Sequence, residues 1–112
     1  MSSDDITLEP REDAFTVLRE KTPAGGRYYI PLDGTRETAE LTWHHNPDGS
    51  ITADHTFVPP SQRGKGLANR LVAELMSDAR VNNWQVIPAC SYVLAETRNH
   101  PEWMALTATR DG

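Results

Sequence analysis

The sequence predicts an α/β domain with a mixed, mostly antiparallel sheet and the element order ββββαβα. Four short apolar runs separated by turn signals fill the first half of the chain. A turn with two glycines then precedes a segment in which apolar residues recur with a period of about 3.6 instead of two. A short apolar run follows that segment, and a strand reached through a helical crossover pairs in parallel.

The four expected strands span residues 14–20, 27–32, 38–45 and 51–58. Alternation in the third predicts a core-facing set of Ala39, Leu41 and Trp43. The sequence NPDGS between the third and fourth strands is typical of a tight turn. The same alternation in the fourth strand predicts one face that carries Ile51, Ala53, His55 and Phe57.

The central helix is predicted from a single apolar stripe, which consists of Leu67, Ala68, Leu71, Val72, Leu75, Met76 and Ala79. Asn82 and Asn83 are a suitable stop, because asparagine tolerates the left-handed conformation. A buried parallel strand is expected over residues 84–88 and a second helix over 90–98, with helix restarting at Pro101.

Length and composition restrict the class of protein. The chain of 112 residues has the size of one domain, so we expect an acidic flexible tail over 1–10 and a single domain over 11–112. A net charge of −5 argues against general nucleic-acid binding. The sequence has no apolar run or leader pattern that suggests membrane association or export, and its single cysteine, Cys90, excludes an internal disulfide. We therefore expect a cytoplasmic protein.

The segment SQRGKGLANR, residues 61–70, lies between the fourth strand and the central helix. A helix N-terminus has unpaired N–H groups and favours anions, and glycine leaves those groups accessible. Arg63 and Lys65 add positive charge, so a phosphate cradle is one interpretation; a tight connection that merely needs glycine is the other. The P-loop spacing is absent, and Asn69 stands where the dinucleotide fingerprint requires a third glycine.

The segments HTFVPPSQRGKGLANRLVAELMSDAR, VIPACSYV and HPEW resemble the small, single-domain branch of the GCN5-related N-acetyltransferases, over about residues 27–104. Ser61 departs from the broad family motif in one register, whereas Arg63, Gly66 and Ala68 fit it in another. The resemblance implies acetyl-CoA binding, with the pyrophosphate on the amides from Arg63 to Ala68. The pantetheine arm would lie between the fourth and fifth strands, where Pro59 and Pro60 are expected to stop strand pairing.

The resemblance also implies catalytic roles for His55 and Cys90. His55 is a candidate base, since partial burial would favour its neutral, proton-accepting form. For Cys90, near a helix start, three roles are open: acid to the CoA thiolate, acetyl-carrying nucleophile, or passive core residue. Tyr92 is an alternative acid, and a backbone N–H near Phe57 or Val58 would stabilise the oxyanion. The cofactor-binding residues expected are Phe57, Val58, Arg63, Gly64, Lys65, Gly66, Leu67, Ala68, Ser91 and Tyr92.

The expected function is acetyl-CoA-dependent N-acetyl transfer made directly to an amine, either a small amine or a protein lysine. The alternatives are a CoA-binding or protein-interaction module with little or no catalysis, and a structural domain without a ligand. Neither nucleic acid nor a membrane is an expected partner. No metal is expected, because the spacing of His44, His45 and His100 matches no known metal site.

Overall fold

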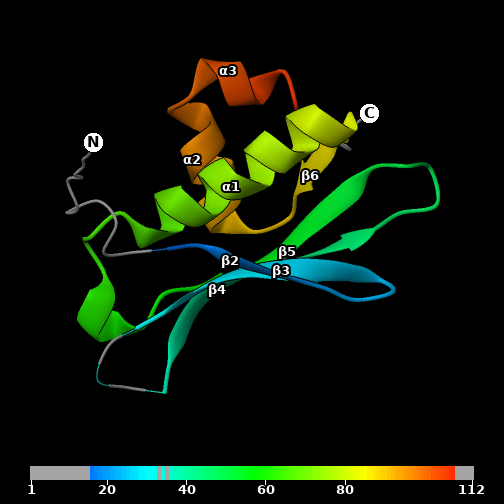
Figure 1. Ribbon diagram of the computed structural model, residues 1–112. Helices are drawn as coiled ribbons and strands as arrows, with labels where there is room; N and C mark the ends of the chain where they lie inside the picture. Colours follow the sequence, from blue (N-terminus) through cyan, green and yellow to red (C-terminus); the bar gives the residue numbers. More distant parts are fainter. Residues whose placement is uncertain (1–15, 33, 35, 108–112) are drawn as a thin grey trace, which may run out of the picture.

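The computed structural model describes residues 16–32, 34 and 36–107, and contains one five-stranded sheet in the order β2-β3-β4-β5-β6 (Figure 1). The strands are β2 (Leu18–Lys21), β3 (Gly25–Pro31), β4 (Thr38–His45), β5 (Ile51–Phe57) and β6 (Val86–Pro88). The helices are the 3-10 turn η2 (Pro60–Gln62), α1 (Leu67–Asn82), α2 (Ser91–Arg98) and α3 (Pro101–Met104). The expected order is confirmed, and so is the parallel pairing of β5 with β6. The expected tail and the start of the first expected strand lie outside the described residues.

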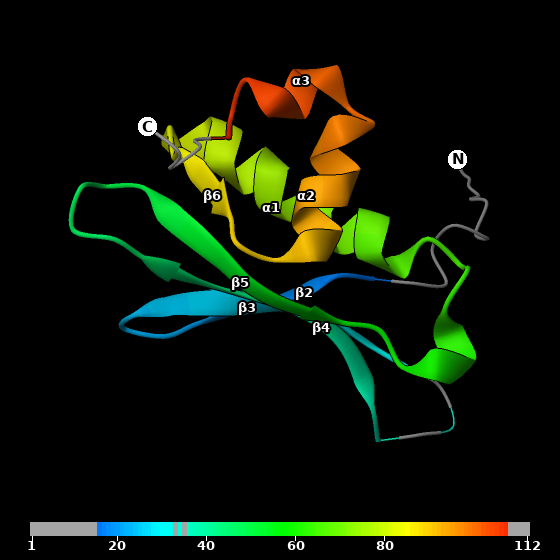
Figure 2. The same cartoon turned by 180° about the vertical axis from the view of Figure 1, so that it is seen from behind.

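The domain has two layers, because α1, α2 and α3 all lie on one face of the sheet (Figures 1 and 2). The predicted stripe of α1 faces the sheet: all its members are buried except Ala68, which is partly buried. It packs against the alternating residues of β4, of which Ala39 and Leu41 are fully buried. In the part of the chain that the structure describes, no helix covers the opposite face of the sheet, which we call the open face.

A β-bulge in β5 changes the predicted faces of that strand. Trp43 pairs with Ala53 and Thr42 pairs with His55, so Asp54 has no partner in the register. One extra residue reverses the alternation beyond it, and therefore Thr56, not His55, is buried under the helices. The expectation that His55 and Phe57 share a face with Ile51 and Ala53 is wrong. Both lie on the open face instead, since they pair with the open-face residues Thr42 and Glu40.

The position at which β5 and β6 part also differs from the expectation. Their pairing covers Ile51–Ala53 and Val86–Pro88 only, so the strands separate directly after Ala53. The prediction that Pro59 and Pro60 cause the separation is wrong, because they come several residues later, at the start of η2. The bulge after Ala53 and the missing N–H group of Pro88 lie at the point of separation and account for it.

The edge strand β2 is held to α1 by charged side chains. Arg19 binds the carboxylates of Glu74 and Asp78, with 2.9 Å between its Nε and Oδ2 of Asp78. The hydroxyl of Tyr28 donates to the same Asp78 oxygen at 2.7 Å. The hydrogen bond from Arg19 holds the pKa of Asp78 below its usual value, while burial and the bond to Asp78 raise the pKa of Tyr28. The Asp78 carboxylate therefore stabilises the folded state in its ionised form.

The end of α1 agrees with the sequence. Asn83 follows the helix with a φ of 59° and donates its N–H to the carbonyl of Ala79. This left-handed residue reverses the chain towards β6. Within the described residues, none of the helices has both the length and the apolar character that crossing a membrane requires.

Candidate functional site

The turn between β5 and α1 has two glycines in the left-handed region. Gly64 has a φ of 84° and Gly66 a φ of 78°, a conformation that side chains with a Cβ atom rarely adopt. Apart from each glycine and its two chain neighbours, none of the described residues has an atom within 4 Å of where a Cβ would stand at either position. Glycine is thus needed here for the backbone conformation, and it leaves open space above the turn.

The turn has a run of backbone N–H groups that find no hydrogen-bond acceptor among the described residues. The first helical hydrogen bond of α1 joins the N–H of Arg70 to the carbonyl of Gly66 at 3.1 Å, and Gly66, as N-cap, offers no capping side chain. Among the described residues, none accepts a hydrogen bond from the backbone N–H groups of Gly64 to Asn69. The N–H of Arg63 is engaged with the carbonyl of Pro60 at 3.3 Å, so the run starts one residue later than expected. Consecutive free donors at the positive end of a helix dipole suit an anion.

A cavity of about 230 Å³ lies against this turn. It is lined by Val58, Gln62, Arg63, Gly64, Gly66, Leu67, Ala68, Asn69, Tyr92 and Glu96. Seven of these belong to the expected cofactor-binding set: Val58, Arg63, Gly64, Gly66, Leu67, Ala68 and Tyr92. The other three, Gln62, Asn69 and Glu96, were not expected, because they are polar but belong to no pattern that would have marked them. Phe57, Lys65 and Ser91 were expected but do not line this cavity.

Hydrogen bonds fix the walls of the cavity. Arg63 folds back so that its Nε donates to the carbonyl of Val58 at 3.0 Å, which holds the turn against the end of β5. On the other side, Asn69 Nδ2 donates to Glu96 Oε1 at 2.9 Å and so joins α1 to α2. Lys65 Nζ donates to Gln62 Oε1 at 3.0 Å. The carboxylate of Glu96 keeps its negative charge, since its Asn69 partner is a neutral amide, and the cationic groups of Arg63 and Lys65 lie on the side of the turn.

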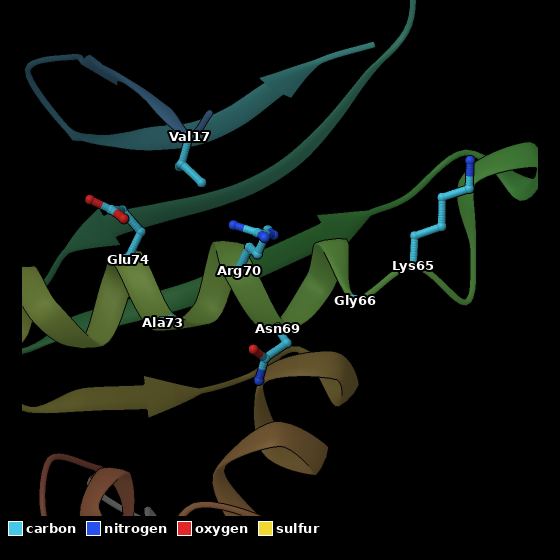
Figure 3. Close-up of a pocket in the computed structure, with 7 residues that line it drawn as sticks. All are labelled: Val17, Lys65, Gly66, Asn69, Arg70, Ala73 and Glu74. Atoms are coloured by element: carbon cyan, nitrogen blue, oxygen red, sulfur yellow. The ribbon is translucent and has the colours of Figure 1, made fainter. Parts of the chain in front are cut away.

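A second hollow of about 500 Å³ adjoins the first across the N-terminus of α1, and Figure 3 shows the seven residues that line it. Arg70 and Glu74 point towards Val17, which precedes β2, whereas Asn69 points to the other side of α1, towards α2 (Figure 3). Gly66 and Asn69 line both hollows. The glycine turn is thus accessible from two sides. Lys65 and Arg70 bring positive charge to the larger hollow of about 500 Å³.

Cys90 lies buried at the N-terminus of α2, as its N-cap residue. Its thiol donates to the hydroxyl of Thr56 at 3.2 Å, across the gap where β5 and β6 have parted. The hydroxyl is available because the bulge turns Thr56, rather than His55, towards the helices. The contact places the only cysteine of the sequence at the wall of that gap.

His55 lies on the other face of the sheet. It is exposed, and no described residue gives it a hydrogen bond or ion pair. The partial burial expected for its neutral form is therefore absent, because the bulge moved the side chain to the open face. The structure does not bring His55 and Cys90 into contact; it brings Cys90 to Thr56. Among the described residues, moreover, no group of three or more His, Cys, Asp or Glu side chains could hold a metal ion.

The sheet, the glycine turn before α1 and the parted strands together define an α/β fold of the N-acetyltransferase class. The match to known families agrees: the model of the GCN5-related N-acetyltransferase family matches residues 27–106, and the chain belongs to this family. A GCN5-like protein of Staphylococcus aureus, solved by NMR in solution, is similar in fold, with a TM-score of 0.65 at 22% sequence identity. The similarity covers 84% of this chain and 90% of that one.

Proposed function

We propose that the protein is an acetyl-CoA-dependent N-acetyltransferase that transfers the acetyl group directly to an amine. Family membership makes acetyl transfer the expected chemistry. The observation that carries the cofactor assignment is the run of free N–H groups from Gly64 to Asn69, which faces a cavity rather than protein acceptors. The pyrophosphate of acetyl-CoA would accept hydrogen bonds from this run. The residues fit this group, since a Cβ at Gly64 or Gly66 would point into space that the anion needs.

The rest of the cofactor has room on both sides of the turn. The hollow with Lys65 and Arg70 would suit the phosphorylated nucleoside, since both side chains are cationic. The pantetheine arm would run from Val58 into the gap between the parted strands. Beyond Ala53, β5 has no partner on the β6 side, so its N–H groups on that edge are available to the arm and to the thioester oxygen.

Direct transfer requires few groups. The neutral amine nitrogen attacks the thioester carbon, the carbon–sulfur bond breaks, the nitrogen gives up one proton and the CoA thiolate takes one; a net proton is released only when the acceptor starts as an ammonium ion. Cys90 would supply the thiolate with a proton and recover it from solvent, while Thr56 orients the thiol. His55 is the base expected from the sequence, but its exposed position leaves it without a group that would orient the ring.

Three measurements test the proposal. Calorimetric titration with CoA should show binding, and incubation of acetyl-CoA with a panel of primary amines should release free thiol. If Cys90→Ala and His55→Ala both retain wild-type turnover, the roles expected for these residues are wrong. Acetyl-CoA alone should leave the mass of the protein unchanged after rapid quenching, whereas an added acetyl group would indicate a covalent route through Cys90.

A CoA-binding module without catalysis is the second candidate, and the separation of His55 from Cys90 favours it. It predicts that CoA raises the melting temperature while no amine is acetylated. Absence of CoA binding would refute both candidates.

A further inference from the structure

Two histidines of the described residues have a carboxylate beside a ring nitrogen, and neither is His55. His100 has both ring nitrogens engaged, Nδ1 with Glu102 at 3.3 Å and Nε2 with Asn69 at 3.2 Å, so it has no free nitrogen for a proton. The other is His44. His44 lies on β4 and Asp54 is the unpaired residue of the β5 bulge. The ring Nδ1 of His44 is 2.8 Å from Oδ1 and 2.9 Å from Oδ2 of Asp54. The side chains are 44% and 37% exposed, so water and ligands reach the pair.

The contact fixes which ring nitrogen of His44 can accept a proton. An ionised carboxylate only accepts hydrogen bonds, so Nδ1 must carry the hydrogen atom that it donates to Asp54. The lone pair of the neutral ring is then on Nε2, for which the described residues provide no partner. A carboxylate that holds an imidazole in one tautomer, with the other nitrogen free, is the arrangement of a general base.

The His44–Asp54 pair lies beside the part of the gap between β5 and β6 in which the thioester of acetyl-CoA would lie. Asp54 is the first residue of β5 after Ala53, the last one paired with β6. It is four residues before Val58 at the cofactor cavity, which is roughly 13 Å of extended chain. The bulge directs Asp54 and His55 to the open face of the sheet. Helices cover the other face (Figure 2). An acceptor amine would therefore reach the gap from the open face, on which His44 pairs with Thr52.

We propose that His44 is the general base for the acceptor amine and that Asp54 is its positioning residue. This inference rests on the proposed acetyl transfer. Nε2 of His44 takes a proton from the ammonium form of the acceptor, which leaves a neutral amine with a lone pair. That lone pair forms the bond to the thioester carbon as the carbon–sulfur bond breaks. The nitrogen then loses its second proton, one proton goes to the CoA thiolate, and His44 returns its own to solvent.

The surroundings of His44 contain few other charges. Its neighbours in the register are Gly25 on β3 and Thr52 on β5, which are uncharged. One pair further along the open face, Thr42 lies between Arg27 and His55. Arg27 is engaged with Glu20 and Glu40, at 2.6 Å and 2.8 Å. Asp54 is therefore the carboxylate that contacts His44 directly. Because the guanidinium of Arg27 is paired with two carboxylates, its positive charge repels a cationic acceptor less.

The experiment measures thiol release from acetyl-CoA with spermidine and, separately, with poly-L-lysine. We expect His44→Gln to lower kcat about 100-fold or more at pH 7.5, the usual contribution of general base catalysis. Its rate should rise about tenfold per pH unit towards pH 9.5, because the amine then loses its proton unaided. Added imidazole should restore turnover to His44→Gly, which a purely structural role for His44 would not allow.

Matched variants separate the possible outcomes. Asp54→Asn should lower kcat about tenfold with little change in KM, while His45→Gln, at the next residue of the same strand, should behave as wild type. All variants should bind CoA. His44→Gln and Asp54→Asn should retain the wild-type melting temperature within a few degrees, since an exposed pair contributes only about 0–1 kcal/mol. A glycine inside a strand, or loss of the edge contacts of His45 with Trp43 and Trp84, lowers stability further, so His44→Gly and His45→Gln are assayed well below their own melting temperatures. Wild-type kcat in His44→Gln, or no imidazole rescue in His44→Gly, overturns this inference and leaves the proposed function intact. Loss of CoA binding in the wild type, or no turnover with any amine, overturns both.

Discussion

Replacement of Gly66 by alanine distinguishes a phosphate cradle from a mere connection. The alanine must adopt a φ of 78°, and its methyl group enters the cavity that Gly66 lines. A left-handed alanine costs about 1–2 kcal/mol of folding free energy, which lowers the melting temperature by roughly 4–16 °C. If the methyl group also displaces the anion from one N–H donor, binding loses about 1.5–3 kcal/mol. That loss corresponds to about a 10- to 100-fold weaker affinity for CoA.

Gly49 provides the matched control. It has a φ of 91° and lies in the hairpin turn between β4 and β5. Beyond its two chain neighbours, no described residue has an atom within 4 Å of its ideal Cβ position. Gly49→Ala should therefore lose the same stability and keep its affinity for CoA. Calorimetric titration gives the affinity and a thermal melt gives the stability. If Gly66→Ala binds CoA as tightly as Gly49→Ala does, the glycines serve only the connection and the cradle is refuted.

Two further predictions concern stability. The pKa of Asp78 lies below its usual value of 3.8 because Arg19 and Tyr28 donate to it. Its contribution to the stability of the folded state is therefore present above that pH and is lost as the pH falls below it. Asp78→Asn should therefore reduce the loss of stability between about pH 5 and pH 2 in urea denaturation, and an unchanged pH dependence would contradict the assignment. Asn83 has a φ of 59°, so Asn83→Gly should keep or raise the stability, whereas Asn83→Ala should lower it by about 1 kcal/mol. Equal melting temperatures for the two would show that the left-handed conformation carries no cost.

The order of elements could be predicted because it depends on signals between near neighbours in the sequence. β4 and α1 follow their apolar periods, and Asn83 ends the helix as expected. The glycine turn was identified for a similar reason, since the demand for a positive φ at Gly64 and Gly66 is local.

Only the tertiary structure decided which residues meet around the gap. The bulge that exposes His55 and buries Thr56 is a property of the pairing between β4 and β5. The sequence of β5 alone does not indicate which residue is left unpaired. Thr56 meets Cys90 from 34 residues away, and Asp54 meets His44 from 10. A period of two assigns faces only while the register is regular. One additional residue in β5 exchanges the two faces of the strand beyond Ala53. As a result, Asp54 lies beside His44, and His55 lies on the open face.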